Sequence, residues 1–292
     1  DVRPLERDRP PSMIVEGIPV PKVVERYASA RSLVGVGLAF LSVFYIVPIL
    51  FLYWNSLNFG SGGLFVHYEQ ALSDVYLVTL ARSFYYGVLT TAVTLSLGYV
   101  LAYYIAFRAS REKLLLGLVV LPLWIAYVIR YLGIQLFLFP SSPFVQLVGT
   151  DFGILFATEG VIIGLTSVFL PFAILPIYHA LTSIDEELVH ASRVLGAGQL
   201  RTIRSVVFPL SLSGVIAGGI IVFILATGSF LAPAMLGGPN DTMIANVIEQ
   251  SYSQTFDLGL ASSLAVIYTT ILLVLLTVFN SYVNLGEVLG EL

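Results

Sequence analysis

The sequence has no cysteine and little charge for its length. Charged residues are 11% of its 292 residues, whereas a soluble domain carries roughly 25%. Hydrophobic residues make up 57%, so the chain could not cover a surface that faces water. Most of it must therefore face lipid or other membrane helices. The absence of cysteine excludes a disulfide framework and cysteine-based metal or redox chemistry.

The sequence also lacks the short motifs of common enzymes. Its two lysines, Lys22 and Lys113, follow no glycine-rich phosphate loop, so no nucleotide is expected to bind through a Walker A motif. The three histidines, His67, His179 and His190, do not have the spacing of metal ligands. Neither Gly-x-Ser-x-Gly nor His-Glu-x-x-His occurs. We therefore expect no catalytic residue, no metal site and no cofactor on this chain.

Long apolar stretches dominate what remains. Six of them can cross the hydrocarbon layer of roughly 30 Å, which takes about 20 helical residues. Lipid offers no hydrogen-bond partners, so these stretches should be helices, and the predicted fold class is an all-α membrane protein. The third stretch contains one charge, Arg130. The predicted spans are residues 33–54, 83–107, 114–139, 160–178, 214–236 and 258–283.

Lysine and arginine set the expected orientation, because they concentrate in cytoplasmic segments. Twelve of the fourteen lie before the first span, after the second span or after the fourth span. The other two, Arg82 and Arg130, lie near the opposite face. This distribution predicts a multi-pass protein whose two tails, residues 1–30 and 284–292, are both cytoplasmic.

The connector between the fourth and fifth spans, residues 180–213, is unusually organised. Acidic residues 185–187 begin a predicted helix, where the helix dipole favours negative charge. Gly196 permits a sharp turn, and Pro209 ends the helical spacing that follows. The pattern fits either a docking helix for a partner protein or an amphipathic helix on the inner leaflet, with Arg201 touching lipid head groups.

This connector resembles the EAA loop of ABC importer permeases. That pattern is roughly Glu-Ala-Ala-x-x-x-Gly-Ala, followed further on by an apolar Pro-Leu-x-x-Pro-Gly-Ile. The sequence departs from it where His replaces Glu, where Ser replaces the second Ala and where Ser replaces the second Pro. The matching positions are His190, Ala191 and Ser192, then Gly196 and Ala197, and then Pro209, Leu210, Ser213, Gly214 and Val215.

The resemblance implies the type I ABC importer permease fold, with a cytoplasmic coupling helix, in a prokaryotic inner membrane. It implies four kinds of partner, namely membrane lipid, a second homologous permease, two cytoplasmic ABC ATPase subunits and an external substrate-binding protein. ATP and Mg would bind to the ATPases, and this chain would perform no chemistry. The residues expected to couple to an ATPase are Glu187, His190, Ala191, Ser192, Arg193, Gly196, Ala197 and Arg201.

Three further runs are similar to the spermidine/putrescine branch of these permeases. They are residues 121–131, 164–176 and 237–248. The resemblance implies a small solute as cargo, with a polyamine favoured. The acidic balance of the predicted outer segments is compatible with a cation. The candidate residues of the substrate pathway are Trp124, Arg130, Asp241 and Glu249.

Several alternatives remain open at this stage. Related permeases carry opines, ferric iron or phosphonates, so the cargo could belong to one of those classes. A channel or secondary transporter that works without ATP is the competing kind of protein. Arg130 could pair with Asp151 or Glu159, or it could reach the outer interface from the end of its helix.

Overall fold

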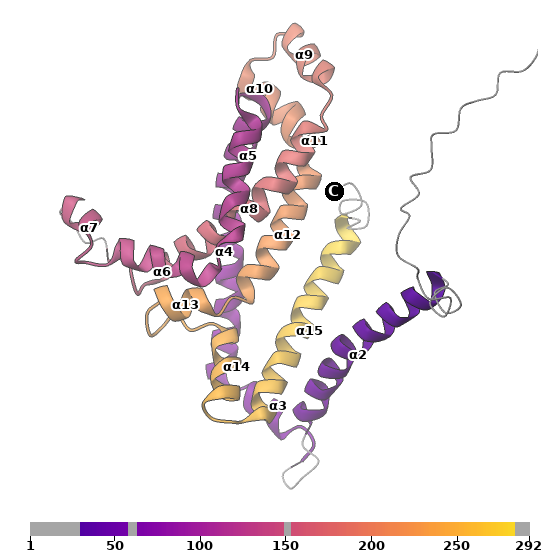
Figure 1. Ribbon diagram of the computed structural model, residues 1–292, viewed down its shortest axis with the longest axis vertical. Coiled ribbons are helices and arrows are strands. Elements are labelled where there is room, and N and C mark those ends of the chain that lie inside the picture. The colour runs from indigo at the N-terminus through magenta and orange to yellow at the C-terminus, as the bar shows by residue number, and fades with distance from the viewer. Residues whose placement is uncertain (1–29, 58–62, 149–152, 284–292) are drawn as a thin grey trace, which may run out of the picture. The chain divides into compact units, whose positions relative to one another are not determined.

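Helices account for most of the described chain (Figure 1). The computed structural model describes residues 30–57, 63–148 and 153–283. Within these ranges η1 is a 3-10 helix, η2 is a π-helix and no strand occurs. In chain order the elements are α2 (Ala30–Ser56), α3 (Val66–Ala71), α4 (Asp74–Phe107), α5 (Glu112–Val120), η1 (Leu121–Trp124), α6 (Tyr127–Leu138), α7 (Pro143–Val148), α8 (Thr158–Thr182), α9 (Glu186–Val194), α10 (Gln199–Thr202), η2 (Ile203–Val207), α11 (Phe208–Leu210), α12 (Leu212–Thr227), α13 (Leu231–Leu236), α14 (Ile244–Ser253) and α15 (Leu258–Val283).

The chain divides into two units, residues 1–51 and residues 52–292. Most of α2 belongs to the first unit, and this helix is apolar with Pro48 in its interior. All the other helices belong to the second unit, which also carries every feature discussed below.

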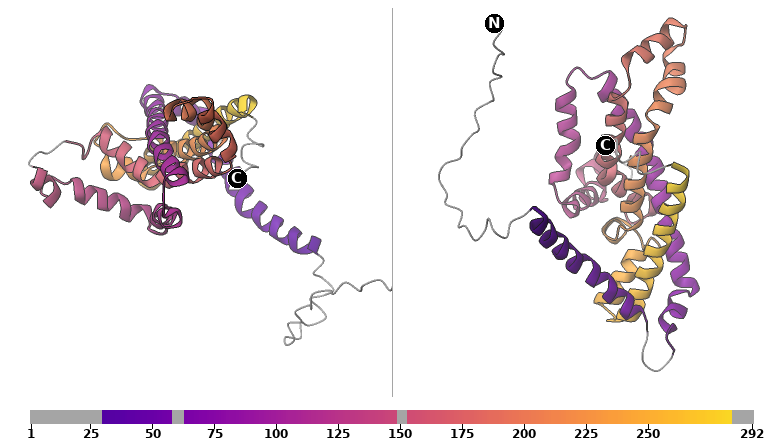
Figure 2. Two further views of the ribbon diagram at one scale, coloured as in Figure 1. Left: turned by 90° about the horizontal axis from the view of Figure 1, so that it is seen from above. Right: turned by 90° about the vertical axis from the view of Figure 1, so that its right-hand side faces the viewer.

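Three helices, α4, α8 and α12, form the centre of the second unit (Figures 1 and 2). Small residues let their backbones approach closely, as is common between membrane helices. A Cβ added at Gly214 of α12 would lie 2.5 Å from the carbonyl oxygen of Pro176 on α8. One added at Gly98 of α4 would lie 3.1 Å from Cβ of Ala173 on α8. Both neighbours therefore rest directly on α8.

A second, smaller core joins α15 to α3, α4 and α14. Its buried members include Leu80 of α4, Ile244 of α14 and Leu264 of α15. Ser263 of α15 also donates a hydrogen bond to the carbonyl oxygen of His67 on α3, at 3.1 Å. The beginning of α15 is thus held to α3 and α14, and Figure 1 shows these three elements together at the lower end of the view.

Five described helices are long and apolar enough to cross a membrane, or six if one bent pair counts as a single span. The third predicted span, residues 114–139, is not one continuous helix. Ile125 and Ala126 are extended, with ψ of 126° and 133°, and they separate η1 from α6. Pro122 has no N–H to donate within a helix, which favours the break. Figure 1 shows α6 turning away from the direction of α5, and the apolar candidate there is Tyr127–Val148 instead.

The fifth predicted span, residues 214–236, is interrupted as well. α12 ends at Thr227, residues 228–230 are not helical, and α13 begins at Leu231. Pro233, in the first turn of α13, cannot donate to the carbonyl oxygen four residues earlier, at Ser229, which removes one helical hydrogen bond across the break. The sequence pattern shows apolar continuity here but does not show the break.

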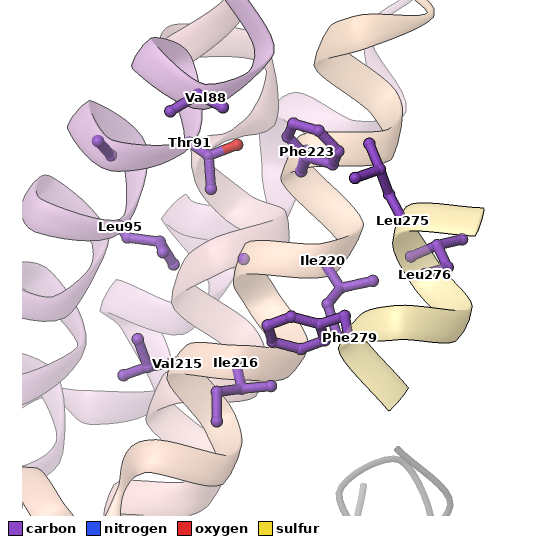
Figure 3. Close-up of a pocket in the computed structure, with 12 residues that line it drawn as sticks. Val88, Thr91, Leu95, Val215, Ile216, Ile220, Phe223, Leu275, Leu276 and Phe279 are labelled. Carbon is purple, nitrogen blue, oxygen red and sulfur yellow. The ribbon is translucent and has the colours of Figure 1, made fainter. Parts of the chain in front are cut away.

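An apolar cleft of about 520 Å³ lies between α4, α12 and α15 (Figure 3). Leu95 of α4, Ile220 of α12 and Leu276 of α15 are among the side chains that line it. Its hydroxyl-bearing residue, Thr91, donates to the carbonyl oxygen of Gly87 on its own helix at 2.7 Å. The cleft therefore offers little to a charged solute, which would lose its hydration there without compensation.

Candidate functional site

The predicted coupling residues lie together on a helical hairpin at the upper end of Figure 1, named here the 185–211 hairpin. Asp185 begins it, because its Oδ1 accepts a hydrogen bond from the N–H of Glu187 at 2.9 Å. Gly196 makes the turn after α9 with φ of +82°, a conformation that favours glycine. The hydroxyls of Ser192 and Thr202 lie 3.1 Å apart and join α9 to α10.

The tip of the 185–211 hairpin exposes large apolar side chains. Val194 is 88% exposed, Leu195 is 87% exposed and Leu200 is 80% exposed. Exposed apolar patches on proteins commonly mark contact sites for a partner. Val189, in contrast, is buried and belongs to the main core. The hairpin is therefore anchored along one face and presents an apolar tip on the other.

The structure brings the eight predicted coupling residues together on this hairpin. Most of their described side chains face outward, as contact residues must. Glu187, His190, Ala191, Gly196 and Arg201 are exposed, Ser192 and Ala197 are half-buried, and the side chain of Arg193 lies outside the described residues.

The 185–211 hairpin joins α12 through a bend of 66°. Ser211 is fully buried at this bend, and its hydroxyl donates to the carbonyl oxygen of Phe208 at 3.1 Å. The same hydroxyl lies 3.1 Å from the hydroxyl of Tyr99 on α4. The ring of Tyr99 also meets the ring of Phe208 edge to face, with centroids 5.5 Å apart. Tyr99 thus braces the bend against α4.

A cavity of about 470 Å³ lies where the two helix breaks meet α8. Ile125 and Ala126 line it from the first break, Gly228 and Ser229 line it from the second, and Phe169 lines it from α8. Non-helical backbone at membrane depth is tolerated where protein buries it or where it lines a water-filled space. The convergence of both breaks on one cavity makes this cavity the candidate for a solute pathway.

Arg130 lines the cavity and is the predicted pathway residue that the structure places there. Its Nη1 donates to the carbonyl oxygen of Val168 on α8 at 3.2 Å. Its Nε is buried and has no hydrogen-bond partner among the described residues. Of the two acids predicted to pair with it, Asp151 lies outside the described residues, and Glu159 is exposed at the start of α8.

The other three predicted pathway residues lie elsewhere. Trp124 is 88% exposed at the end of η1 and does not line the cavity. Glu249 is exposed on α14, where its Oε1 accepts a hydrogen bond from Ser253 at 2.7 Å. Asp241 is 6% exposed, and its oxygens are occupied by hydrogen bonds within the fold. The structure therefore does not gather these residues into one pathway.

Asp241 joins three parts of the second unit. Its Oδ1 accepts from the hydroxyl of Tyr86 on α4 at 2.5 Å and from the hydroxyl of Thr158 at 2.7 Å. Its Oδ2 accepts from the N–H of Gly238 at 2.8 Å. Burial by itself raises the pKa of this carboxyl, but these hydrogen bonds and nearby Arg82 outweigh burial and hold the pKa below its usual value. Asp241 is therefore ionised at neutral pH.

More side chains of α4 hold the same segment, named here the 237–246 connection. Arg82 donates to the carbonyl oxygen of Thr242 at 3.0 Å. Ser83 accepts from the N–H of Ile244 at 2.7 Å, and that N–H belongs to the first turn of α14. Backbone carbonyl and N–H groups are costly to bury without partners, and α4 supplies partners to two of them. The 237–246 connection is therefore fixed to α4 at successive points.

Charged groups are too sparse to form a metal centre in the part of the chain that the structure describes. No three His, Asp or Glu side chains there are close enough to hold an ion. The cavity at the helix breaks is lined by one guanidinium, that of Arg130, and by aromatic residues, which suit noncovalent contact with a solute.

Comparison with known proteins identifies the family. The family described as binding-protein-dependent transport system inner membrane component matches residues 95–285. The chain belongs to this family. It is therefore a multi-pass permease subunit of the inner membrane, and the resemblance to importer permeases inferred from the connector is confirmed.

Curated relatives place it more closely within the family. The spermidine/putrescine transport system permease protein PotB of Escherichia coli K12 is 30% identical over 220 residues, which cover 73% of this chain and 80% of the relative. PotB of Haemophilus influenzae is 32% identical over 242 residues, which cover 79% of this chain and 83% of the relative.

Solved structures confirm the importer permease fold. A bacterial ABC transporter involved in the import of the acidic polysaccharide alginate matches with a TM-score of 0.74 at 18% identity, covering 89% of this chain and 96% of that one. The MetNI methionine ABC transporter matches with a TM-score of 0.51 at 20% identity, covering 76% of this chain and 100% of that one. The predicted all-α permease fold is thus confirmed.

Sequence reasoning about this permease missed two hydroxyl contacts. Tyr86 and Asp241 are 155 positions apart, and Tyr99 and Ser211 are 112 apart. Tyr86 and Tyr99 stand within a long run that is rich in tyrosine, where packing is the ordinary role. An acidic residue close to the end of a predicted span is the sign in the sequence that could have pointed to the Asp241 contacts.

Proposed function

We propose that this permease subunit forms half of a translocation pathway for a polyamine such as spermidine or putrescine. Relatives from two species, both named for spermidine/putrescine transport, support this cargo. The cavity at the helix breaks supports a pathway through this subunit, with aromatic residues whose rings can offset the lost hydration of ammonium groups.

The exposed apolar tip of the 185–211 hairpin is the main support for the proposal that ATP drives this transport. Val194, Leu195 and Leu200 are costly to expose in water, and a groove on a cytoplasmic ATPase would bury them. In this assembly two ATPase subunits bind ATP and Mg, a second homologous permease completes the pathway, and an external binding protein delivers the cargo. This chain contributes no catalytic residue.

Motion then enters the permease at the 185–211 hairpin. When the ATPases close on ATP, they displace the hairpin, and the bend at Ser211 transmits the displacement to α12. The end of α12 at Thr227 leads directly into residues 228–230, which line the cavity. Displacement of α12 therefore changes the cavity at the point where its backbone is already irregular.

Orientation is part of the proposal, with both tails and the 185–211 hairpin in the cytoplasm. The native chain has no cysteine, so single cysteines give a clean test. Gln199 on α10 and Ser253 on α14 are both exposed. An impermeant thiol reagent should label Ser253→Cys in intact cells and should label Gln199→Cys after the membrane is permeabilised. Labelling of Gln199→Cys in intact cells would reverse the orientation.

Cargo is tested with the complete complex in proteoliposomes. ATP hydrolysis should rise when the binding protein is added with spermidine or putrescine, and labelled polyamine should accumulate inside. Equal concentrations of an anionic phosphonate should leave both quantities at their basal levels. Stimulation by the anion, with none by either polyamine, rejects the polyamine cargo and keeps the importer assignment.

One observation favours a second candidate cargo. Arg130 is a permanent cation in the cavity, and its Nε has no partner among the described residues. A cargo with a carboxylate or phosphonate group could accept from this guanidinium. Opine-type and phosphonate-type solutes have such groups, so the anion arm of the experiment above also tests this alternative.

A further inference from the structure

We propose that Tyr99 is a positioning residue for transport, through which the 185–211 hairpin acts on α4. This inference rests on the proposed function, because it assigns the route by which motion of the hairpin reaches the spans. It concerns a residue that neither the connector motif nor the cavity includes.

The first step is that α12 is tightly seated beyond the bend. Gly214 and Gly218 place the α12 backbone against α8, where a Cβ at Gly218 would lie 3.2 Å from Cα of Ala173. The first two turns of α12 therefore have little freedom to rotate against α8. Rotation of the hairpin must therefore be absorbed in the bend or pass to another helix that touches the bend. α4 touches the bend and also rests on α8, where a Cβ at Gly98 would lie 3.1 Å from Cβ of Ala173, so it would carry the motion as one packed element.

The second step is that the segment just before the bend has a helical form that can change. Residues 203–207 form the π-helix η2, a wider turn that is rare and frequently found at functional sites. Converting one π-turn to an α-turn would rotate the hairpin by about 100°, the angle between successive residues of an α-helix. The hairpin can thus rotate without rotating α12, while its displacement still passes through the bend to α12.

The third step is that Tyr99 holds the bend from α4. The Ser211 hydroxyl has one hydrogen, and it donates to the carbonyl oxygen of Phe208. While Ser211 donates to Phe208, its oxygen is free to accept from Tyr99 across the 3.1 Å contact between the two hydroxyls. Together with the edge-to-face contact to Phe208, this bond ties both sides of the bend to α4.

Motion of α4 can reach a distant part of the permease, because the N-terminal half of α4 holds the 237–246 connection. Tyr99 and Tyr86 lie on the same continuous helix, and Tyr86 donates to Asp241. A rotation or tilt of α4 produced at Tyr99 would therefore be felt at the connection. Tyr99 links the two ends of the permease through one rigid element.

The test is Tyr99→Phe, which removes the hydroxyl and keeps the ring. Tyr104→Phe is the matched control, since Tyr104 is 53% exposed on the same helix. Ser211→Ala removes the acceptor, and Ser205→Ala is its control, because Ser205 donates to Arg201 within its own helical segment. Each variant is assayed in the complete complex for cargo transported per ATP hydrolysed.

Tyr99→Phe and Ser211→Ala should each lower this ratio about three- to tenfold, the factor by which one hydrogen bond shifts an equilibrium. The double variant should fall no further than either single variant, and both controls should match the native chain. Assembly and melting temperature should stay near native values. An unchanged ratio in Tyr99→Phe overturns the proposal, as does a loss that merely follows loss of assembled complex.

A second measurement separates this proposal from the proposed function. Spin labels at Gln199→Cys on the hairpin and Ser96→Cys on α4, both exposed positions, report the distance between the two elements in the assembled complex without cargo. The distribution should broaden in Tyr99→Phe and stay narrow in Tyr104→Phe. An unchanged distribution in Tyr99→Phe overturns the inference even if polyamine transport is confirmed. Absence of polyamine transport with a broadened distribution affects the proposed function alone.

Discussion

The 237–246 connection and the 185–211 hairpin lie at opposite ends of α12 and are held in opposite ways. The connection has a buried carboxylate with three hydrogen bonds and further contacts from Arg82 and Ser83. The hairpin meets α4 through the Tyr99 contacts and exposes an apolar tip. One end is fixed by internal hydrogen bonds, and the other ends in an exposed apolar surface.

This difference separates two kinds of polar residue in this permease. Hydrogen bonds to a charged group contribute about 1.5–3 kcal/mol each, so the connection should stay bonded to α4 throughout transport. The hairpin has fewer such bonds, and local units with few buried contacts open and shift most readily. A mutation at either end can abolish uptake, but for different physical reasons.

The largest expected effect is at Asp241, on the fixed side of the comparison. Asp241→Ala removes the acceptor of three donors, of which the Tyr86 and Thr158 hydroxyls, 3.0 Å apart, can pair only with each other, and it should destabilise the fold by about 4 kcal/mol. Thermal melting of the purified protein checks this, with Glu249→Ala as a control that should change stability by less than about 0.5 kcal/mol. Lost uptake in Asp241→Ala with native melting would instead make Asp241 a pathway residue.

The next effect is at Gly214, where the moving and fixed parts of the chain meet. Gly214→Ala places a methyl group 2.5 Å from the carbonyl oxygen of Pro176, so α12 must lift from α8 at a cost of about 2 kcal/mol. Gly117→Ala is the control, because nothing lies within 4 Å of a Cβ there. Melting should fall in the first variant and hold or rise in the second. Equal melting would show that α12 is not tightly seated on α8.

A smaller effect is expected at Gly196, on the hairpin side. Gly196→Ala has space for a methyl group, but φ of +82° disfavours any residue with a Cβ by about 1–2 kcal/mol. The strain is confined to the hairpin, so membrane insertion and global melting should stay native while co-purified ATPase falls. Gly198→Ala serves as the control, since its φ is −66°. Equal ATPase recovery in both variants would contradict the docking role of the turn.

The smallest effect is expected at Glu249, which is exposed beyond the fixed connection. Glu249→Gln should lower polyamine uptake by less than about threefold, because an exposed charge acts through steering that salt screens. Uptake is measured at low and at physiological ionic strength, and the defect should shrink at the higher one. A defect that does not depend on salt would place Glu249 in direct contact with the cargo.

The family and the helical class were accessible from the sequence because they depend on local patterns. Apolar length gives helices in lipid, and the spacing from His190 to Val215 carries the permease resemblance. The turn at Gly196 also follows from one residue type. None of these inferences requires knowing which helices touch.

The breaks at residues 121–126 and 228–230 were harder to predict, because a continuous helix and an interrupted one can have the same apolar sequence pattern. Pro122 and Pro233 marked the places, yet Pro171 and Pro176 lie inside α8 without ending it. Whether a proline interrupts a membrane helix depends on whether neighbouring helices bury or hydrogen-bond the backbone groups that lose their helical partners. The sequence also suggested that Asp241 belongs to the pathway. It could not show that Tyr86 and Thr158, which are distant in sequence, donate hydrogen bonds to this carboxylate.

The break between η1 and α6 has a consequence for how the protein is made. Residues 121–126 leave the ribosome well before α8, the helix whose Val168 carbonyl receives Arg130 and whose side chains line the cavity beside the break. Until α8 is synthesised, the non-helical backbone of the break and the Arg130 guanidinium have no contact with α8 in the bilayer. We therefore expect nascent chains that stop before Thr158 to be held at the insertion machinery or degraded, and chains that extend past Thr182 to be released into the membrane.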